Sequence, residues 1–393
     1  MNAFDIPALD IDLYSAGSRN DPYSNYRRVR DSAPVVYFPK YECYGIGRFR
    51  DVRDALLKWQ IFSSGQGVAM NEAMNSAIAG GTLGSDDPTH ARLRRIVGRP
   101  LTPARLSKLR DRIYAEADAI VDRLVVQGSF DAATELAEHL PLTVVSELVG
   151  LPDEGRQRML AWGAANFNSL GPRGEPLTEE ALPLVAEMVD YAYRCTRDRV
   201  KPESWAAELF DAADQGEVPQ SQVAALFNDY VGPSLDTTIY AVSNTIYLFA
   251  RFPEQWAVLR QEPWRLRNAI NEAIRLESPA QFLSRLSVTD YHLGDYVLPA
   301  GSRVILMFAS ANRDERMWER PEEFDITRRA VDQLGFGHGV HICLGANLAR
   351  LEVAAILESL LRRVEHFEVV GAERAQNNVL RGFAHLQVIV RAA

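Results

Sequence analysis

A cysteine lies in a glycine-rich loop directly before a predicted helix, and no other stretch of the sequence indicates its chemistry as clearly. The loop covers residues 336–345 and reads Phe-Gly-His-Gly-Val-His-Ile-Cys-Leu-Gly, with the cysteine at position 343. A helix N-terminus supplies unpaired N–H groups and the positive end of the helix dipole, and both favour a thiolate over a thiol. The glycines allow a backbone to approach the sulfur, or a flat cofactor on it, closely. The loop therefore suits a charged sulfur.

The residues alone leave several roles open for Cys343. A buried structural cysteine is the most frequent role of a lone cysteine. A zinc site lacks the usual number of ligands, because no second cysteine is near and His341 adds only one. A nucleophilic cysteine needs a base that is held by a third group, which the sequence does not exclude. The remaining role is a thiolate ligand of haem iron.

The loop resembles the cysteine-ligand loop of the cytochromes P-450, F-[GS]-x-[GD]-x-[RH]-x-C-x-G, at every specified position. The resemblance implies that Cys343 is the axial ligand, and hence the metal ligand, of haem b (iron protoporphyrin IX). Phe336, His341 and Gly345 are then expected to contact the haem. It also implies an enzyme that activates O2, with electron donation from the thiolate favouring O–O cleavage.

A second segment carries two basic side chains on one helix face. Residues 86–94 follow the pattern D-x-P-x-H-x-x-x-R, which places His90 and Arg94 at i, i+4. A solvated basic helix is an equally good interpretation of these residues alone. The pattern is similar to a helix of the same family, and this implies that both side chains reach the haem propionates. Arg285, in a later strand-like run, matches another propionate-binding arginine of the family.

Three more arginines lie on other faces of the same helix and form a local basic cluster in an acidic protein, namely Arg92, Arg95 and Arg99. Such a cluster favours docking of an acidic electron carrier. We expect a ferredoxin to bind there and to be reduced by an NAD(P)H-dependent ferredoxin reductase.

A long apolar run predicts a core helix over about residues 220–252, with a kink at Pro233. Asp236 and Thr237 follow the kink, and polar groups in a core helix are costly unless they are paired or face a cavity. In the resembling family this is the acid–alcohol pair, so Thr237 is expected to hydrogen-bond at the oxygen site and Asp236 to relay protons. Pro233 and Ser234 replace the small residues that the family commonly has, which changes the expected oxygen groove.

The remaining features define the fold class. Glu272 and Arg275 match the family's structural E-x-x-R pair, and five motifs follow in the family's order over about residues 20–390. We therefore expect a mainly α protein with small β-sheets, the cytochrome P-450 fold in a single domain over residues 1–393. No run of 18 apolar residues indicates a membrane span, and the N-terminus lacks a leader pattern. The net charge of −9 argues against nucleic acid, and three scattered cysteines fit a cytoplasmic location.

The substrate is predicted from local likenesses at residues 63–68, 166–172 and 278–281. These resemble bacterial members that oxidise para-substituted benzoates or demethylate methoxybenzoates, and that hold the carboxylate with an arginine and serines. Here the corresponding places have Gln66 and Ala69, and Asn228, Asp229 and Gly232. Because Asp229 would repel an anion, we expect a small neutral aromatic, such as a guaiacol-type methoxyphenol, to be hydroxylated or O-demethylated. The predicted substrate pocket comprises Gln66, Val68, Met70, Phe167, Leu170, Asp229, Gly232, Leu235, Ala280, Leu283 and Phe383.

Alternative functions are a para-substituted benzoate monooxygenase and a hydroxylase of terpenoids or other small apolar compounds. A peroxide-using haem enzyme normally lacks the acid–alcohol pair, so Asp236 and Thr237 speak against it. A haem sensor has no signalling or DNA-binding segment to act through in this sequence.

Overall fold

The structure is a computed structural model that describes residues 5–393. The α-helices of this part of the chain are α1 (Ala16–Asn20), α2 (Tyr23–Ser32), α3 (Phe49–Leu57), α4 (Glu72–Ile78), α5 (Thr89–Val97), α6 (Pro103–Gln127), α7 (Ser146–Val149), α8 (Asp153–Asn168), α9 (Pro176–Arg194), α10 (Trp205–Asp214), α11 (Val223–Val231), α12 (Asp236–Arg251), α13 (Pro253–Gln261), α14 (Leu266–Leu276), α15 (Phe308–Ala311) and α16 (Ala346–Arg363). The strands are β1 (Val36–Phe38), β2 (Cys43–Ile46), β3 (Phe62–Ser63), β4 (Ser129–Asp131), β5 (Leu283–Ser287), β6 (Tyr291–Leu293), β7 (Tyr296–Leu298), β8 (Arg303–Leu306), β9 (Val364–Arg374) and β10 (Phe383–Ala392). The mainly α architecture with small sheets confirms the predicted fold class.

Short helical turns connect these elements. The 3₁₀ turns are η1 (Pro39–Tyr41), η2 (Arg99–Leu101), η5 (Gln220–Gln222), η6 (Pro263–Arg265) and η7 (Gly339–His341), and two π-helices are η3 (Ala132–Ala137) and η4 (Pro141–Val145). π-Helices are rare and are often found at functional sites.

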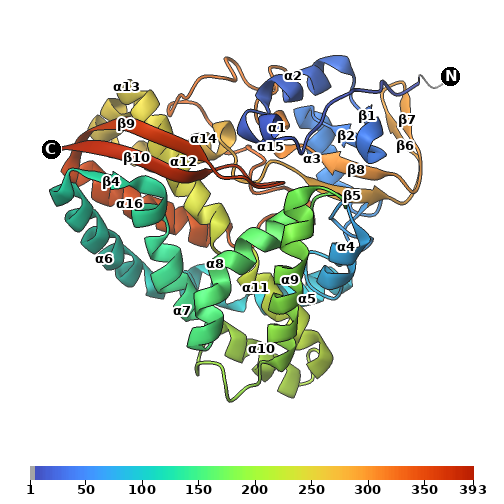
Figure 1. The fold of residues 1–393 in the computed structure, drawn as a ribbon, viewed down its shortest axis with the longest axis horizontal. Coiled ribbons are helices and arrows are strands. Elements are labelled where there is room, and N and C mark those ends of the chain that lie inside the picture. Colours follow the sequence, from blue (N-terminus) through green and yellow to red (C-terminus); the bar gives the residue numbers. More distant parts are fainter. Residues whose placement is uncertain (1–4) are drawn as a thin grey trace.

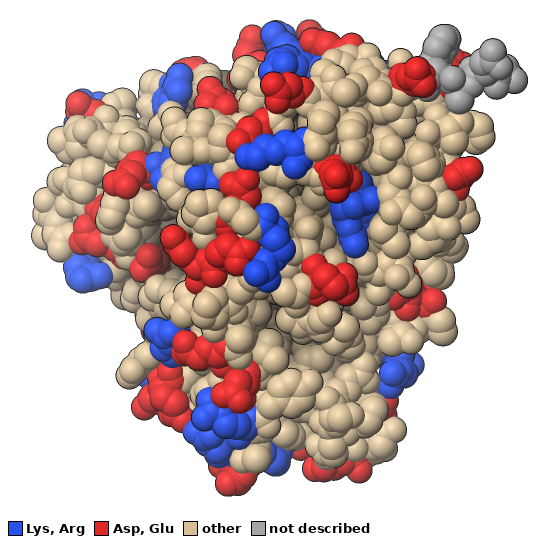
Figure 2. Space-filling view, turned by 45° about the vertical axis from the view of Figure 1, so that its right-hand side comes forward, with Lys and Arg blue, Asp and Glu red and all other residues tan. Residues whose placement is uncertain are grey.

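The strands form three sheets that lie around the helical core (Figure 1). One sheet has the order β1-β2-β8-β5-β3, with β2 and β8 parallel and the other pairs antiparallel. The second has the order β4-β10-β9, and β9 and β10 extend as a long hairpin at the C-terminal end of the chain. The third is the β6-β7 hairpin. On the face drawn in Figure 2, acidic and basic side chains are interspersed and leave large uncharged areas between them.

Helices α6 and α16 pack against each other and cover one side of the core. Pro103 begins α6, where its missing N–H costs nothing, and Gly128 ends it with a φ of 74°. Apolar side chains recur on one face of α6 and are buried, as in Ile113, Ala117 and Leu124. This packing fixes the start of α16, which directly follows the cysteine loop.

The predicted core helix over about residues 220–252 is two helices, α11 and α12, because the chain leaves helical geometry at residues 232–235. Pro233 has no N–H for the carbonyl four residues earlier, and its ring crowds that carbonyl. Ser234 Oγ donates to the carbonyl oxygen of Tyr230, and Thr237 Oγ1 donates to that of Pro233 (3.2 Å). These side chains satisfy carbonyls that the break leaves free.

Two buried ion-pair groups join α14 to distant segments. Arg275 binds Glu272 through two bonds of 2.7 and 2.8 Å, and Arg328 reaches the same carboxylate at 3.1 Å, which confirms the structural role predicted for the E-x-x-R pair. Glu277 follows α14 and accepts from three arginines, which are Arg313 (3.2 Å), Arg374 (3.3 Å) and Arg381 (3.1 Å).

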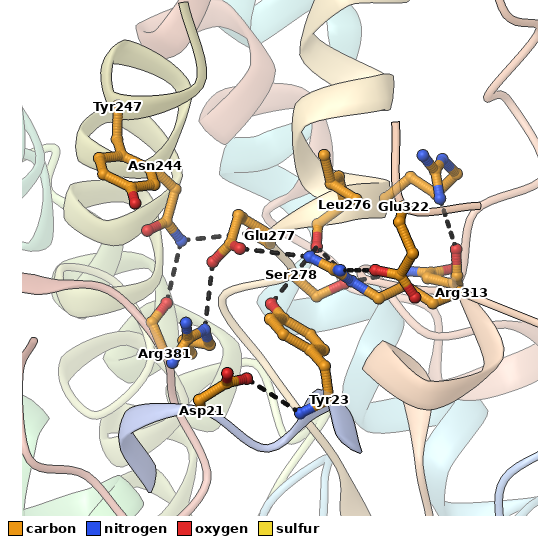
Figure 3. A network of polar contacts seen from close by, with 12 residues as sticks. Asp21, Tyr23, Asn244, Tyr247, Leu276, Glu277, Ser278, Arg313, Glu322 and Arg381 are labelled. Carbon is orange, nitrogen blue, oxygen red and sulfur yellow. Dashed lines mark hydrogen bonds and ion pairs between the residues drawn. The ribbon is translucent and has the colours of Figure 1, made fainter. Parts of the chain in front are cut away.

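The surroundings of Glu277 are drawn in Figure 3. Asn244 of α12 donates to the carbonyl oxygens of Glu277 (3.2 Å) and Arg381 (3.0 Å). The guanidinium of Arg313 lies 3.4 Å from the ring centre of Tyr23 on α2. Glu277 and the arginines that it binds therefore join α2, α12, α14 and the turn before β10, through the carboxylate, the backbone carbonyl oxygen of Glu277 and the Tyr23 ring.

Candidate haem and substrate site

A cavity of about 320 Å³ lies between α4, α5, α8, α9, α11, α12 and the cysteine loop. Every residue predicted to bind the cofactor lines it, namely His90, Arg94, Arg285, Phe336, His341, Cys343 and Gly345. These residues are up to 255 positions apart in the chain, between His90 and Gly345, so the fold brings them together.

The cysteine loop presents its sulfur to this cavity. The Cys343 N–H donates to the carbonyl oxygen of Phe336 (2.8 Å), which closes the loop. Gly339 has a φ of 72°, and a Cβ there would lie 2.5 Å from the carbonyl oxygen of Leu56, so the turn needs a glycine. The Cys343 side chain lines the cavity and is exposed to it.

The protonation of the sulfur differs from the expectation for a helix N-terminus. Burial raises the pKa of the Cys343 thiol, and this outweighs the N–H groups of Gly345 and Ala346 and the positive charges of Arg94 and Arg350, which lower it. The loop itself thus leaves a thiol, and a bound metal ion would supply the missing stabilisation of the thiolate.

Two histidines meet at one end of the cavity. The rings of His90 and His341 are 4.1 Å apart, and the Nε2 atom of each is buried without a hydrogen-bond partner. His90 Nδ1 lies 3.1 Å from Asp87 Oδ1, which fixes the direction of the ring. Burial, followed by Arg285, His90 and Arg94, lowers the pKa of His341 to about 3. Unpartnered buried nitrogens are costly, so this end of the cavity is built for an acceptor.

Two arginines complete the basic end. Arg285 donates to the carbonyl oxygen of Ser284 (2.7 Å), and burial lowers its pKa to about 10. Arg94 donates to the carbonyl oxygen of Ile342, and burial lowers its pKa as well. Two arginines and two unpartnered imidazole nitrogens around one space fit a ligand with two carboxylates, and a thiol in the same cavity fits its metal ion. The residues therefore fit haem, with its two propionates and its iron.

Comparison with known proteins agrees with this geometry. The cytochrome P450 family profile matches residues 195–383. Cytochrome P450 CYP199A2 of Rhodopseudomonas palustris is 36% identical over 393 residues, which cover 98% of this chain and 94% of that protein. The chain belongs to the cytochrome P450 family. Linalool 8-monooxygenase of Pseudomonas putida is 28% identical, with 96% and 97% covered.

Solved P450 structures share the fold over nearly the whole chain. CalO2 is 27% identical with a TM-score of 0.84 and covers 97% of this chain and 99% of its own. Epothilone D-bound P450epoK is 25% identical with a TM-score of 0.86, with 98% and 100% covered. As a P450, the protein is a monooxygenase that binds haem b through a cysteine thiolate and uses O2. Among residues 5–393, no helix is long and apolar enough to cross a membrane.

The two residues of the acid–alcohol pair, Asp236 and Thr237, lie on different sides of α12. Thr237 lines the cavity together with Ser234, Thr238 and Ala241, whereas Asp236 does not. Asp236 faces α8 instead, where a Cβ at Gly163 would lie 3.2 Å from its Oδ2 atom. That oxygen is buried without a hydrogen-bond partner. Burial, followed by the negative charge of Glu138, raises the pKa of Asp236 to about 7.

Helix α11 contributes the polar part of the remaining wall. Asn228 Oδ1 is buried without a partner, and Asp229 Oδ2 accepts from the N–H and the hydroxyl of Thr82, both at 2.9 Å. Both side chains line the cavity. Burial raises the pKa of Asp229 to about 6, although the two bonds from Thr82 lower it.

The structure separates the predicted substrate pocket into two groups. Five of its residues line the cavity, namely Phe167, Leu170, Asp229, Ala280 and Leu283. The other six do not, namely Gln66, Val68, Met70, Gly232, Leu235 and Phe383.

The physical reasons differ among these six. Gln66 is exposed, Val68 and Leu235 are buried in the core, and Met70 is held beside Leu170 by a backbone bond of 2.8 Å. Gly232 packs against Asn166, and the Phe383 ring packs on Tyr247 at 4.8 Å with the Arg374 guanidinium over it.

Apolar residues of α9 and α10 complete the wall and were not predicted from the sequence, namely Val185, Met188, Val189 and Trp205. On α9 they recur at intervals of three and four residues, which marks a buried helix face. The spacing does not reveal that this face borders a cavity instead of other side chains. Glu352 on α16 also lines the cavity, and burial raises its pKa to about 8.

Proposed function

We propose that this monooxygenase hydroxylates or O-demethylates a small neutral aromatic that carries a hydrogen-bond donor, such as a guaiacol-type methoxyphenol. The observation that carries the proposal is the pair Asn228 and Asp229 on the cavity wall, where the unpartnered Asn228 Oδ1 atom needs a donor. A phenol hydroxyl supplies one donor and little else. A buried acceptor left without a partner costs about 1–3 kcal/mol, so a ligand that donates to it is favoured by a similar amount.

Much of the remaining wall is apolar and includes an aromatic ring. Phe167 and Leu170 face it from α8 and the turn that follows, and Met188 and Val189 from α9. A small aromatic ligand would bury its ring against these side chains, at about 25 cal/mol per Å² of apolar surface. The lining thus supports an aromatic or similarly apolar substrate with one polar end.

A benzoate is disfavoured by the charges of the wall. The basic side chains that line the cavity within residues 5–393 are His90, Arg94, Arg285 and His341, and these suit the haem propionates. A substrate carboxylate near Asp229 would face a negative charge at pH values above about 6, without a cation to offset it. A neutral phenol avoids that repulsion.

The chain's own residues then divide the work. The bound haem, held by Cys343, supplies oxygen activation at its iron. Thr237 Oγ1 can turn from the carbonyl oxygen of Pro233 toward the cavity and donate a hydrogen bond there. Asp236 exchanges protons behind it, because its pKa of about 7 lets it hold or release a proton near neutral pH.

Electron supply follows the general pattern of bacterial P450s, which receive electrons from a ferredoxin and its reductase. We propose that the ferredoxin docks near Arg92, Arg95 and Arg99. Arg95 is exposed, whereas Arg92 and Arg99 both bind Glu217, through its carbonyl oxygen and its carboxylate. Arg95 therefore offers the freest charge, and its replacement by Ala is expected to weaken ferredoxin binding most of the three.

The test is a panel of small aromatics scored by the low-to-high-spin optical shift and then by product analysis. We expect 4-ethylguaiacol to bind more tightly than 4-methoxybenzoate. Asn228→Leu should weaken 4-ethylguaiacol binding by about 1–3 kcal/mol, or roughly 5- to 150-fold. Asn166→Leu is the matched control, because it removes an amide from the α8 wall of the same cavity. A large shift with 4-methoxybenzoate and none with the guaiacol would refute the proposal.

A further inference from the structure

The turn between α8 and α9 is fastened to the start of α4 by one buried side chain. Asn71 is 5% exposed, and its Nδ2 group donates to the backbone carbonyl oxygens of Ser169 and Gly171, both at 2.7 Å. Between these two, the carbonyl oxygen of Leu170 accepts the N–H of Met70 (2.8 Å). Three consecutive carbonyl groups of the turn are therefore held by two consecutive residues before α4. We call this line of contact the seam.

The seam is part of the cavity wall, and the wall is thin there. Leu170 lines the cavity from the turn, and Met74 lines it from the first turn of α4. Arg173, three residues after Leu170, is exposed, and so are Glu72 and Ala73 directly before Met74. A single layer of chain thus separates the cavity from solvent along the seam, whereas the wall formed by α16 is covered by α6.

The other side of the turn is anchored independently. Helices α8 and α9 pack along each other (Figure 1). Asn378, which precedes β10, donates through Nδ2 to the carbonyl oxygen of Asn168 (2.6 Å) and to Thr178 Oγ1 (2.9 Å). These bonds hold the end of α8 and the start of α9, but not the carbonyl groups of residues 169–171. Release of Asn71 would therefore free the turn from α4 while the two helix ends stay in place.

We infer that Asn71 limits the size of the ligand that the cavity accepts. A ligand that fits the closed cavity of about 320 Å³ leaves the seam intact. A larger ligand displaces Leu170 and the turn outward, and this breaks both bonds from Asn71. The cost of breaking buried hydrogen bonds falls only on the larger ligand, so the seam favours small aromatics by opposing the alternatives.

Asn71 does not itself line the cavity, so it acts through the turn and is a positioning residue. The inference rests on the proposed use of this cavity for the substrate, but not on which aromatic compound is oxidised. Its test therefore uses ligands that bind the haem-loaded protein without being turned over.

The test compares two azoles that bind haem iron through a ring nitrogen, so that the optical shift reports binding directly. Imidazole is small, whereas 1-tritylimidazole carries three phenyl rings. Asn71→Ser keeps a side-chain oxygen that can cap α4, as Asn71 Oδ1 does for the N–H of Met74 (2.9 Å), but lacks the two N–H donors. In this variant we expect the Kd of 1-tritylimidazole to fall roughly 5- to 150-fold and that of imidazole to change less than about twofold.

Asn75→Ser is the matched control. Asn75 lies on α4, is 9% exposed and makes two bonds to the backbone of Ala69 (2.8 and 3.3 Å), but none to the turn. It should leave the affinities for both azoles unchanged. An equal gain for the bulky azole in Asn75→Ser, an equal change for both azoles in Asn71→Ser, or no gain for the bulky azole in Asn71→Ser would each overturn the inference.

The unmodified protein provides a second measurement that does not depend on the folding of a variant. Hydrogen exchange of the Met70 amide reports the opening of the seam, because this N–H donates to Leu170. Saturating 1-tritylimidazole should speed this exchange at least about tenfold, whereas imidazole should not. Unchanged exchange with the bulky azole bound, or no binding of that azole to either protein, would also overturn the inference. Failure of the aromatic panel would bear only on the proposed substrate.

Discussion

Glu277 offers a sharp test of how the fold is held together, because one buried carboxylate binds three guanidinium groups. Two of them, Arg313 and Arg381, are seen in Figure 3. Replacement by glutamine keeps the shape but removes the charge. Arg313 also pairs with Glu322 and keeps a partner, whereas Arg374 and Arg381 contact no other carboxylate among the described residues. Removing one partner of a buried ion pair costs about 3–5 kcal/mol, since it leaves a buried charge unpaired.

The expected change in melting temperature follows from the size of the protein. An unfolding entropy of about 2.1 cal/mol/K per residue gives about 0.8 kcal/mol/K for this chain of 393 residues. A loss of about 4 kcal/mol therefore lowers the melting temperature of Glu277→Gln by about 5 °C. Circular dichroism at equal haem saturation and equal heating rate measures this shift. Glu322→Gln is the control, because its half-exposed pair should contribute no more than about 1 kcal/mol.

The same pair of variants has a defined pH dependence. Burial pushes the pKa of Glu277 up, but Arg381, Arg374 and Arg313 together outweigh burial, so the pKa lies below its usual value. A lowered folded-state pKa means that the stabilisation is present above the unfolded pKa and is lost as the pH falls through the folded pKa. The deficit of Glu277→Gln should therefore shrink in acid. A deficit no larger than that of Glu322→Gln at neutral pH would refute the reasoning.

Two further predictions concern the cavity. Cys343→Ser should leave a folded protein but abolish the thiolate signature in the spectrum of the reduced carbon monoxide complex; retention of that signature would contradict the assignment of the iron ligand. The affinity for 4-ethylguaiacol should fall as the pH drops through about 6, because protonation removes the charge of Asp229 as an acceptor, and Asp229→Asn should flatten this dependence in an optical titration.

The cofactor side of the site was predictable because its signals are local. Cys343 lies in a turn that needs glycines at fixed positions, and these are visible in the sequence. His90 and Arg94 are one helical turn apart, so their spacing alone shows that they share a helix face. All seven predicted haem contacts line the cavity for this reason. That these distant segments meet at one cavity was predicted from the family resemblance, because the spacing within one segment carries no information on the position of another.

The direction of Asp236 was not predictable in the same way. On one continuous helix, Asp229 and Asp236 are seven residues apart and would share a face. The break at residues 232–235 changes the rotation of α12 relative to α11. Asp229 therefore lines the cavity, whereas Asp236 faces α8. A proline indicates that a helix is interrupted, but not through what angle the chain turns.

The early substrate loop shows a different difficulty. Gln66, Val68 and Met70 lie in irregular chain, where neither a helical nor a strand period assigns a direction to each side chain. The loop is bonded to β5 and β8 through Ser284 and Arg303, and these contacts position the three side chains. Those strands are more than 200 residues away in the sequence.

The bonds between Thr82 and Asp229 have a consequence for changing the enzyme by directed evolution. Asp229 lines the cavity, and its carboxylate also anchors the segment between α4 and α5 through two bonds from Thr82. Libraries that vary position 229 to accept new substrates will therefore also remove the bonds that hold this segment. A selected variant can then differ from the parent enzyme both in substrate preference and in the rigidity of the segment. Varying Asn228, whose side-chain oxygen holds nothing in place, separates the two effects.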